Sequence, residues 1–489
     1  MKKKIILITI LIVLISVGRL YPVEKLTLDR ALEIAFKNSP SIQETALRLE
    51  ISEHNLKAQQ ASLKSQFNLT ITPVDISDSR VFNELTSSYN TQERVKSEAQ
   101  FSITQPIKWT DGTLTIIEKI NWQDASSSYT GSVKESNYSN SLYFRFNQPL
   151  FTYNRTKLRT KELKLALENA RLNYAIRKLQ IENQVTQQFL NLYYRLKSIE
   201  ISNEEFKNST ESFEIIGSKV DAGISAKEEL YQADLTRANS QASLESNQIQ
   251  YENALDNFKI LLGVPFEMEL EIITDIRKSL REVDLSKAVT HGLNNRMELR
   301  QKDIAVQNAL NDIIRTAAEN EFKASVDVSL GLTGTDNKFK DIYQSPNNDK
   351  LVAISVNIPI FDWGKKKHNL AASHAQVESS KLSAREEKRN IQLEIRQAYR
   401  NLQLQKTNIG IAEKNVKNAR LTYEINLERY KGGDLSSKDM QFYQLQLSEE
   451  QLKEVQALIN YKVALLDLKI RTLWDFEKNR PLVEVEHEK

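Results

Sequence analysis

The stretch from Ile395 to Met440 reads IRQAYRNLQLQKTNIGIAEKNVKNARLTYEINLERYKGGDLSSKDM and decides the fold. Apolar side chains recur in it every seven residues, at Ile395, Leu402, Ile409, Val416, Tyr423 and Tyr430. A seven-residue apolar repeat predicts a helix that supercoils against a partner helix. The two glycines at 432 and 433 then predict the end of the helix, because glycine tolerates a positive φ.

A second apolar seam follows directly after this turn. Its members are again seven residues apart, at Leu445, Leu452, Ile459, Leu466 and Leu473. Two long helices joined by a tight turn predict an antiparallel coiled-coil hairpin. A similar pattern begins near Leu158, breaks at Ala222-Gly223 and returns toward Gly263. The outgoing arm of this first hairpin is about 70 residues, hence roughly 100 Å long.

The composition gives no sign of a nucleic-acid partner or of thiol chemistry. The chain has 489 residues, with 67 basic and 64 acidic side chains and no cysteine. Disulfides, thiolate metal sites and a lipid-modified N-terminal cysteine are therefore excluded. The low counts of glycine (13) and proline (9) favour long uninterrupted helices.

Residues 1–18 are predicted to be a secretory signal peptide. Three lysines at 2–4 precede an apolar run at 5–17, and Ser16 and Gly18 supply small residues for cleavage. A retained membrane anchor is the alternative, although the apolar run is shorter than the ~20 residues needed to span a bilayer. The chain is thus expected to be exported.

The pattern of the first half restarts in the second half. Leu28, Ala31 and Asn38 match Leu285, Ala288 and Asn295 at a constant offset, which also places Phe67 on Ala324. A second constant offset relates Asn147, Val185, Phe213, Gly223 and Tyr251 to Asn357, Ile395, Tyr423, Gly433 and Tyr461. Two internal repeats are therefore predicted.

Each predicted repeat contains short helices, then strands, then a coiled hairpin. The first repeat covers 19–275, with strands within 66–149 and the hairpin at 152–263. The second covers 276–476, with strands within 324–360 and the hairpin at 364–474. Residues 477–489 form a C-terminal tail.

Alternating apolar residues predict strands with one apolar face. They occur at Phe67 and after Ala324, and again before Pro149 and Pro359, which gives four strands per chain. Residues 73–100 look polar and loop-like. Hairpin signals near Phe101 and Leu114 leave the strand count within 66–149 open.

The apolar strand face could form the core of a soluble sandwich or meet lipid in an outer-membrane barrel. A membrane sheet must close on itself so that every backbone group is paired. Four strands cannot close into a barrel, whereas three such chains would supply twelve. Threefold association would also give the long helices partners.

The whole mature chain resembles the TolC-like outer-membrane efflux protein family. The resemblance is carried by three short motifs and by the order in which they occur. The motifs are Leu28-x-x-Ala31-Leu32 with Asn38-Ser39-Pro40, then Pro359-Ile360-Phe361-Asp362-x-Gly364, then Tyr430-x-x-Gly433-x-x-Ser436-x-x-Asp439-Met440. The resemblance implies a mainly α fold with a membrane β-barrel portion. It implies a homotrimer whose twelve-stranded barrel, in contact with outer-membrane lipid, continues into an α-helical tunnel in the periplasm.

The resemblance also implies a function without cofactors. The family's channels complete tripartite efflux pumps or type I secretion systems. They dock on a periplasmic adaptor and, through it, on an inner-membrane pump, and an iris of helices opens their tunnel. Drug, metal and protein cargo all stay open as alternatives.

The same resemblance assigns residues to the periplasmic entrance. Asp439 matches an aspartate that narrows the entrance, where three copies would form a ring that favours cations. Its alternative role is that of an acid in the first turn of a helix. Tyr430 matches a tyrosine that latches the entrance closed, and Glu229 takes the place of its acidic partner. Simple seam packing is the alternative for Tyr430, and a place in the first turn of its helix is the alternative for Glu229.

The sequence departs from the family at two entrance positions. The expected latch arginine is replaced by Leu435, and a second aspartate is replaced by Phe442. Adaptor contacts are expected at the two hairpin tips, which carry Gly223, Ile224, Gly433 and Asp434.

No residue pattern indicates catalysis. The five histidines lack paired metal-ligand spacing, and neither a nucleophile elbow nor a phosphate-binding glycine loop is present. The sequence therefore predicts a channel rather than an enzyme. An exported soluble coiled-coil scaffold without channel activity is the alternative, and it leaves the alternating strands unexplained.

Overall fold

The computed structural model describes residues 24–84, 87–127, 134–273 and 279–482. The predicted signal peptide lies outside the described residues, as does the end of the predicted tail. The chain divides into two compact units. One contains residues up to Leu47 together with Leu172–Arg300 and Arg385–Lys489, and the other contains Arg48–Arg171 and Gln301–Ala384.

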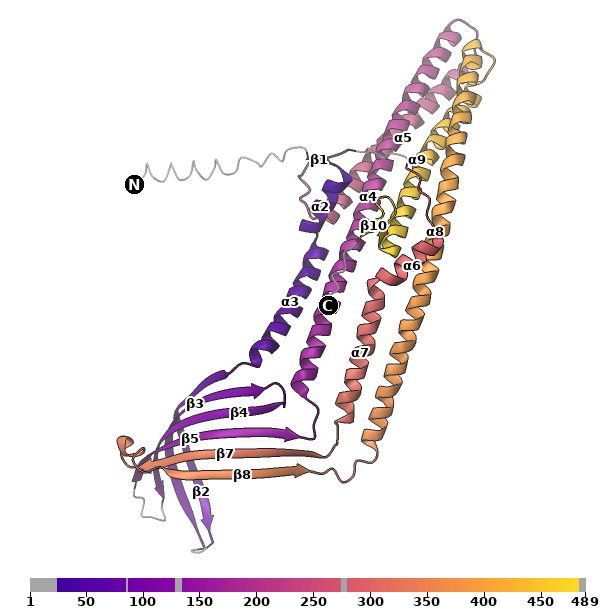
Figure 1. Ribbon diagram of the computed structural model, residues 1–489. Coiled ribbons are helices and arrows are strands. Elements are labelled where there is room, and N and C mark those ends of the chain that lie inside the picture. Colours follow the sequence, from indigo (N-terminus) through magenta and orange to yellow (C-terminus); the bar gives the residue numbers. More distant parts are fainter. Residues whose placement is uncertain (1–23, 85–86, 128–133, 274–278, 483–489) are drawn as a thin grey trace, which may run out of the picture. The chain divides into compact units, whose positions relative to one another are not determined.

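Two long helical hairpins make most of the first unit (Figure 1). Helix α4 (Arg155–Asp221) is followed by α5 (Lys227–Leu262), and α8 (Lys365–Gly432) by α9 (Ser437–Thr472). The seam predicted from the heptads is buried, since Ile395 and Leu402 are fully enclosed. The α4–α5 hairpin thus spans residues 155–262, and the α8–α9 hairpin spans residues 365–472.

Short amphipathic helices cover the hairpins within this unit. Helix α2 (Leu28–Asn38) packs on α5, and α6 (Leu285–Asn295) packs on α9. The parallel pair β1 (Glu24–Leu26) and β6 (Leu270–Ile272) adds Leu26, Leu270 and Ile272 to the core under α2. A second small pair, β9 (Trp474–Asp475) and β10 (Arg480–Pro481), follows α9. Neither pair was predicted from the sequence.

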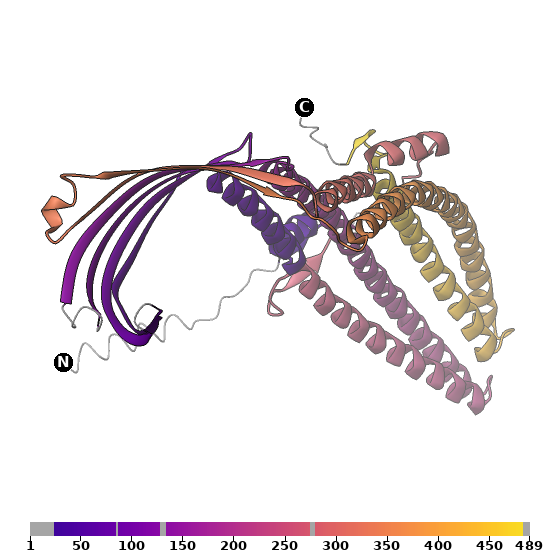
Figure 2. The same cartoon turned by 90° about the horizontal axis from the view of Figure 1, so that it is seen from below.

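The second unit holds one antiparallel six-stranded sheet, parts of α4 and α8, most of α3 (Pro40–Ser62) and α7 (Met297–Ala317), and a 3-10 turn, η2 (Phe339–Asp341). Figure 2 shows how strongly the sheet curves. The strands lie in the order β2 (Gln66–Asn83), β3 (Ser88–Ile107), β4 (Gly112–Ser127), β5 (Lys134–Leu150), β7 (Lys323–Asp336) and β8 (Asn347–Asn357).

The loop predicted at 73–100 is wrong, and the strand count that the hairpin signals near Phe101 and Leu114 left open is six per chain and not four. Strand β2 runs on to Asn83, and β3 with β4 forms an additional hairpin between β2 and β5. The alternation in β3 is hard to recognise because its charged side chains alternate with weakly apolar ones. Those charges pair on one face of the sheet, where Glu98 contacts Lys96 and also Lys119 of β4.

The two faces of the sheet differ in polarity. Register places apolar side chains of all six strands on one face: Phe67, Leu69, Ile71, Phe101, Ile103, Leu114, Ile116, Phe144, Phe146, Val328, Leu330, Val352 and Ile354. Many of them are exposed, Phe67 by 65% and Ile354 by 69%. An extended apolar face open to its surroundings needs a partner other than water.

No helix in the described part of the chain has an apolar stretch long enough to cross a membrane.

Candidate gate at the tips of the helical hairpins

Each hairpin turns at a glycine in the left-handed conformation. Gly433 has φ +93°, its N–H donates to Tyr430 O (3.1 Å), and Asp434 N donates to Arg429 O (2.9 Å). The turn at Gly223 (φ +70°) repeats this pattern of hydrogen bonds. Both turns are Schellman caps, which only glycine makes without backbone strain.

Tyr430 lies at the centre of a small core that joins the two hairpins near their tips. Its side chain is fully buried against Ile216 of α4, Ala233 of α5 and Met440 of α9. The hydroxyl donates to the Ser212 carbonyl (3.2 Å) and lies 3.3 Å from Ser437 Oγ. Tyr430 therefore both continues the seam, as its alternative role required, and makes polar contacts across the hairpins.

Glu229 reaches the same place from α5. Its carboxylate accepts a hydrogen bond from the backbone N–H of Ser437 (2.8 Å), the first residue of α9. An acid at a helix N-terminus satisfies a free N–H and favours the helix dipole. Burial raises the pKa of Tyr430, the hydrogen bond with Ser437 opposes this, and the charge of Glu229 adds to the rise, so the phenol stays protonated.

Lys219 was not predicted to belong to this cluster. Its ammonium donates to Tyr430 O and lies 5.3 Å from the centre of the Tyr430 ring. Ser212 and Ser437 were missed as well, because backbone contacts between two hairpins leave no spacing signal in the sequence. Tyr430, Ser437 and Glu229 together form what we call the tip link.

Leu435, found where the family resemblance expects an arginine, packs on this core. It is partly buried among the apolar neighbours of Tyr430. The tip of this chain thus uses an apolar contact at a position where a charged one was expected.

Asp439 is exposed and lies in the first turn of α9, whose N-cap is Ser436. Ser436 Oγ donates to its carboxylate (2.7 Å), and the Asp439 N–H donates to Ser436 Oγ (3.2 Å). These contacts are those of an acid in the first helical turn, the alternative considered for this residue. Its exposure leaves the carboxylate free to face solvent.

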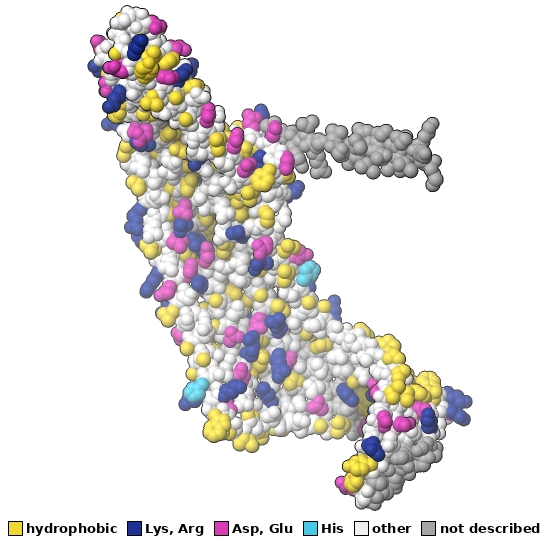
Figure 3. Space-filling view, turned by 180° about the vertical axis from the view of Figure 1, so that it is seen from behind, with side chains coloured by type: hydrophobic (Ala, Val, Ile, Leu, Met, Phe, Trp, Pro, Cys, Tyr) yellow, Lys and Arg dark blue, Asp and Glu magenta, His cyan; other side chains and the backbone are white. Residues whose placement is uncertain are grey.

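The predicted adaptor contacts lie at the exposed ends of the hairpins. Ile224 is 73% exposed, Gly223, Gly433 and Asp434 are exposed, and nothing lies within 4 Å of a Cβ added at Gly223. Figure 3 shows hydrophobic side chains gathered at the tips among charged ones. Tyr231 and Phe442, 72% and 62% exposed, add apolar surface near these turns.

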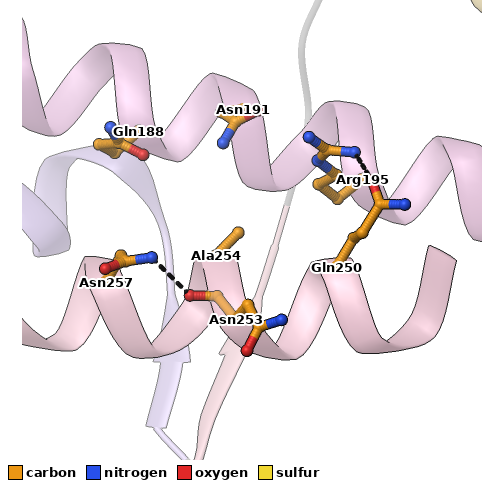
Figure 4. Close-up of a pocket in the computed structure, with 7 residues that line it drawn as sticks. All are labelled: Gln188, Asn191, Arg195, Gln250, Asn253, Ala254 and Asn257. Atoms are coloured by element: carbon orange, nitrogen blue, oxygen red, sulfur yellow. Dashed lines mark hydrogen bonds between the residues drawn. The ribbon is translucent and has the colours of Figure 1, made fainter. Parts of the chain in front are cut away.

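Further along the hairpins, a polar groove of about 510 Å³ lies between α4 and α5 (Figure 4). Its described lining consists of Gln188, Asn191, Arg195, Gln250, Asn253, Ala254 and Asn257. Arg195 donates to Gln250, and Asn257 donates to Asn253 O (2.9 Å). These side chains can hydrogen-bond but supply no acid, base or nucleophile. Among the described residues no three His, Asp or Glu side chains gather into a metal site.

The partly buried carboxyl of Glu205 leads to a prediction of how the stability of the protein depends on pH. Burial between α4 and its neighbours raises the pKa of this carboxyl, despite hydrogen bonds from Ser448 and Ser240. Because the pKa of Glu205 is higher in the folded state than in the unfolded state, its ionised carboxylate lowers the free energy of unfolding at neutral pH. This loss of stability disappears as the pH falls through the raised pKa and the carboxyl becomes protonated. We expect Glu205→Gln to raise the unfolding temperature, followed by circular dichroism, at pH 8 but not at pH 4.

The exposed neighbour Glu204 provides the control. Glu204→Gln should leave the unfolding temperature nearly unchanged at both pH values. Equal stabilisation by the two substitutions would show that general charge, and not burial of Glu205, is responsible.

The fold described above is that of a bacterial outer-membrane channel. The CmeC outer membrane channel of Campylobacter jejuni matches with a TM-score of 0.69 and 14% identity, over 94% of this chain and 87% of that one. The outer membrane protein VceC of Vibrio cholerae matches with a TM-score of 0.67 and 14% identity, over 91% and 95%. The open state of the MtrE channel of Neisseria gonorrhoeae matches with a TM-score of 0.63 and 13% identity, over 91% and 88%.

The chain belongs to the outer membrane efflux protein family. The sequence model of this family matches residues 114–264 and 289–470, more than half of the chain. No curated protein sequence matches it. The resemblance drawn from the motifs is confirmed, and the chain is an outer-membrane protein with a channel role in transport, not an enzyme.

Proposed function

We propose that this protein is the outer-membrane channel of a tripartite efflux pump or type I secretion system, and that it works as a homotrimer. The tip link is the observation that carries the proposal. It joins two hairpins through a buried tyrosine and a carboxylate contact, at the point where the hairpins end. Such a link can hold an entrance closed and release it when the hairpins separate.

In this proposal the hairpins of three copies form a periplasmic tunnel that opens as an iris. Tyr430 and Glu229 hold the closed form, and the exposed tips at Gly223, Ile224, Gly433 and Asp434 contact a periplasmic adaptor. An inner-membrane pump supplies the energy. The polar groove between α4 and α5 suits a water-exposed wall.

The proposal includes the two repeats, at 19–275 and 276–476. The repeats are supported by the equal lengths of corresponding helices, since α2 and α6 each have 11 residues and α5 and α9 each have 36. Helices α4 and α8, with 67 and 68 residues, also correspond. The additional hairpin β3–β4 is the main difference between the halves.

Fractionation and size measurement test this proposal against the soluble scaffold. We expect the protein to stay with outer membranes after osmotic shock and to be trimeric in detergent by light scattering. Release by osmotic shock, or a monomer in detergent, would support the scaffold instead.

Asp439 gives a second test of the entrance. We expect Asp439→Asn to lower the cation selectivity of the channel in planar bilayers several-fold and to weaken block by trivalent cations, because a ring of three carboxylates loses its charge. The helix cap is the hydroxyl of Ser436, which accepts from the backbone N–H of residue 439, so the substitution keeps the cap and the fold should be unaffected. The exposed tip residue Asp434 is the control, and Asp434→Asn should change selectivity much less. Unchanged selectivity in Asp439→Asn would remove Asp439 from the entrance.

A further inference from the structure

The six-stranded sheet has two open edges. Within the described chain, β2 pairs only with β3 and β8 only with β7. Because the six strands alternate in direction, β2 and β8 run antiparallel to each other. Two copies of the chain could therefore join β8 to β2 and continue the alternation.

The residues just after β8 continue its apolar alternation without being part of the strand. Ile358 and Ile360 fall on the same face as Val356 by alternation, yet they are not in a strand and are 62% and 94% exposed. The matching residues after Asn147 behave differently. Gln148, Pro149 and Leu150 continue β5 and pair with β7.

The seam between β5 and β7 joins the two proposed repeats within one chain. Its register sets Asn147 opposite Asp327 and Leu150 opposite Ala324. Asn147 also donates a side-chain hydrogen bond to Asp327. In the repeat alignment Asn147 corresponds to Asn357, and Ala324 corresponds to Phe67, so Asp327 corresponds to Thr70.

We propose that β8 of one copy pairs with β2 of the next in the register of the β5–β7 seam, with Asn357 opposite Thr70 and Ile360 opposite Phe67. Ile358 then lies opposite Leu69, and β8 lengthens to Ile360. The exposed isoleucines join the apolar face, and both edges lose their free backbone groups.

The strand count of the assembly follows from this seam and rests on the proposed homotrimer. Each chain supplies six strands, so three copies close into a barrel of eighteen strands and not the twelve expected from four strands per chain. The hairpin β3–β4 thus widens the barrel. Barrels of about sixteen to eighteen strands enclose a water-filled channel, which the polar face with Lys96, Glu98 and Lys119 would line.

Engineered cysteines test the seam in a chain that has no cysteine of its own. We expect the double variant Thr70→Cys/Asn357→Cys to form intermolecular disulfides in outer membranes and to run as a covalent trimer on a non-reducing gel. The pair Gln66→Cys/Asn357→Cys shares the same strands and face but lies four residues out of register. That is about 13 Å along the strand, too far for a disulfide, so it should not cross-link.

The outcomes separate this inference from the proposed function. A detergent-stable trimer that cross-links only through Gln66→Cys, or through neither pair, would overturn the seam while leaving the channel proposal standing. A protein that is monomeric would overturn both. Cryo-electron microscopy of the wild-type trimer should show eighteen strands, and twelve strands would overturn the count. Deleting residues 84–133 should keep the Thr70→Cys/Asn357→Cys cross-link and reduce the count to twelve.

Discussion

Replacing Tyr430 with Ala is expected to shift the channel strongly toward its open form. The fully buried side chain contacts both hairpins at the tip, and its removal costs about 3–5 kcal/mol of packing. Since ~1.4 kcal/mol changes an equilibrium tenfold, the closed-to-open ratio should fall by at least about a hundredfold. In planar bilayers the mean single-channel conductance should rise accordingly, with Tyr430→Phe, which loses only hydroxyl contacts, in between.

Tyr461 is a matched control for this substitution. It is also a fully buried tyrosine, and its hydroxyl accepts from Arg281 N (2.7 Å) and donates to Ser279 O (3.4 Å). It packs in the core of α6, α8 and α9 and not in the tip core. Tyr461→Ala should destabilise the protein without raising conductance. Equal conductance changes in Tyr430→Ala and Tyr461→Ala would contradict a specific role for the tip.

Replacing Gly263 with Ala is expected to give the largest loss of stability among the helix-ending glycines. Gly263 ends α5 at φ +70°, and an added Cβ would lie 2.5 Å from the carbonyl oxygen of Asn38, the last residue of α2. The left-handed backbone costs alanine about 1–2 kcal/mol. Forcing the two backbones apart adds about 1–3 kcal/mol. The unfolding temperature of the purified protein should fall markedly.

A substitution at Gly223 measures the cost of the left-handed backbone without the cost of the contact with Asn38. Gly223 has the same φ of +70°, yet nothing lies within 4 Å of an added Cβ. Gly223→Ala should therefore show the backbone cost alone, and its unfolding temperature should fall less than that of Gly263→Ala. Equal losses would mean that the contact between α2 and the end of α5 contributes nothing.

The helices could be predicted well because their signals are local. The heptad from Ile395 to Tyr430 and the glycines that follow it specify a seam and its end, and Ile395, Leu402 and Tyr430 are buried as the pattern requires. The first part of strand β3 was predicted to be a loop because a strand with Arg94 and Lys96 on one face looks polar, and only the hairpin signals near Phe101 and Leu114 pointed to its second part. Its partners on β2 and β4, which make the pattern a sheet, are distant in the sequence.

The candidate gate was only partly predictable. Tyr430 and Glu229 could be found by resemblance, and the structure brings both to Ser437. Lys219 and Ser212 could not be found, because they act through the ammonium–carbonyl and hydroxyl–carbonyl contacts that they make with Tyr430. Such contacts depend on how two hairpins pack, which no short sequence pattern records.

Single-channel recording on the detergent-purified protein tests the central claim most directly. We predict discrete conductance steps in planar bilayers for the wild-type protein, a higher time-averaged conductance for Tyr430→Ala, and a time-averaged conductance unchanged for Tyr461→Ala. If neither the wild-type protein nor Tyr430→Ala conducts ions while both are folded and trimeric, the channel account is contradicted.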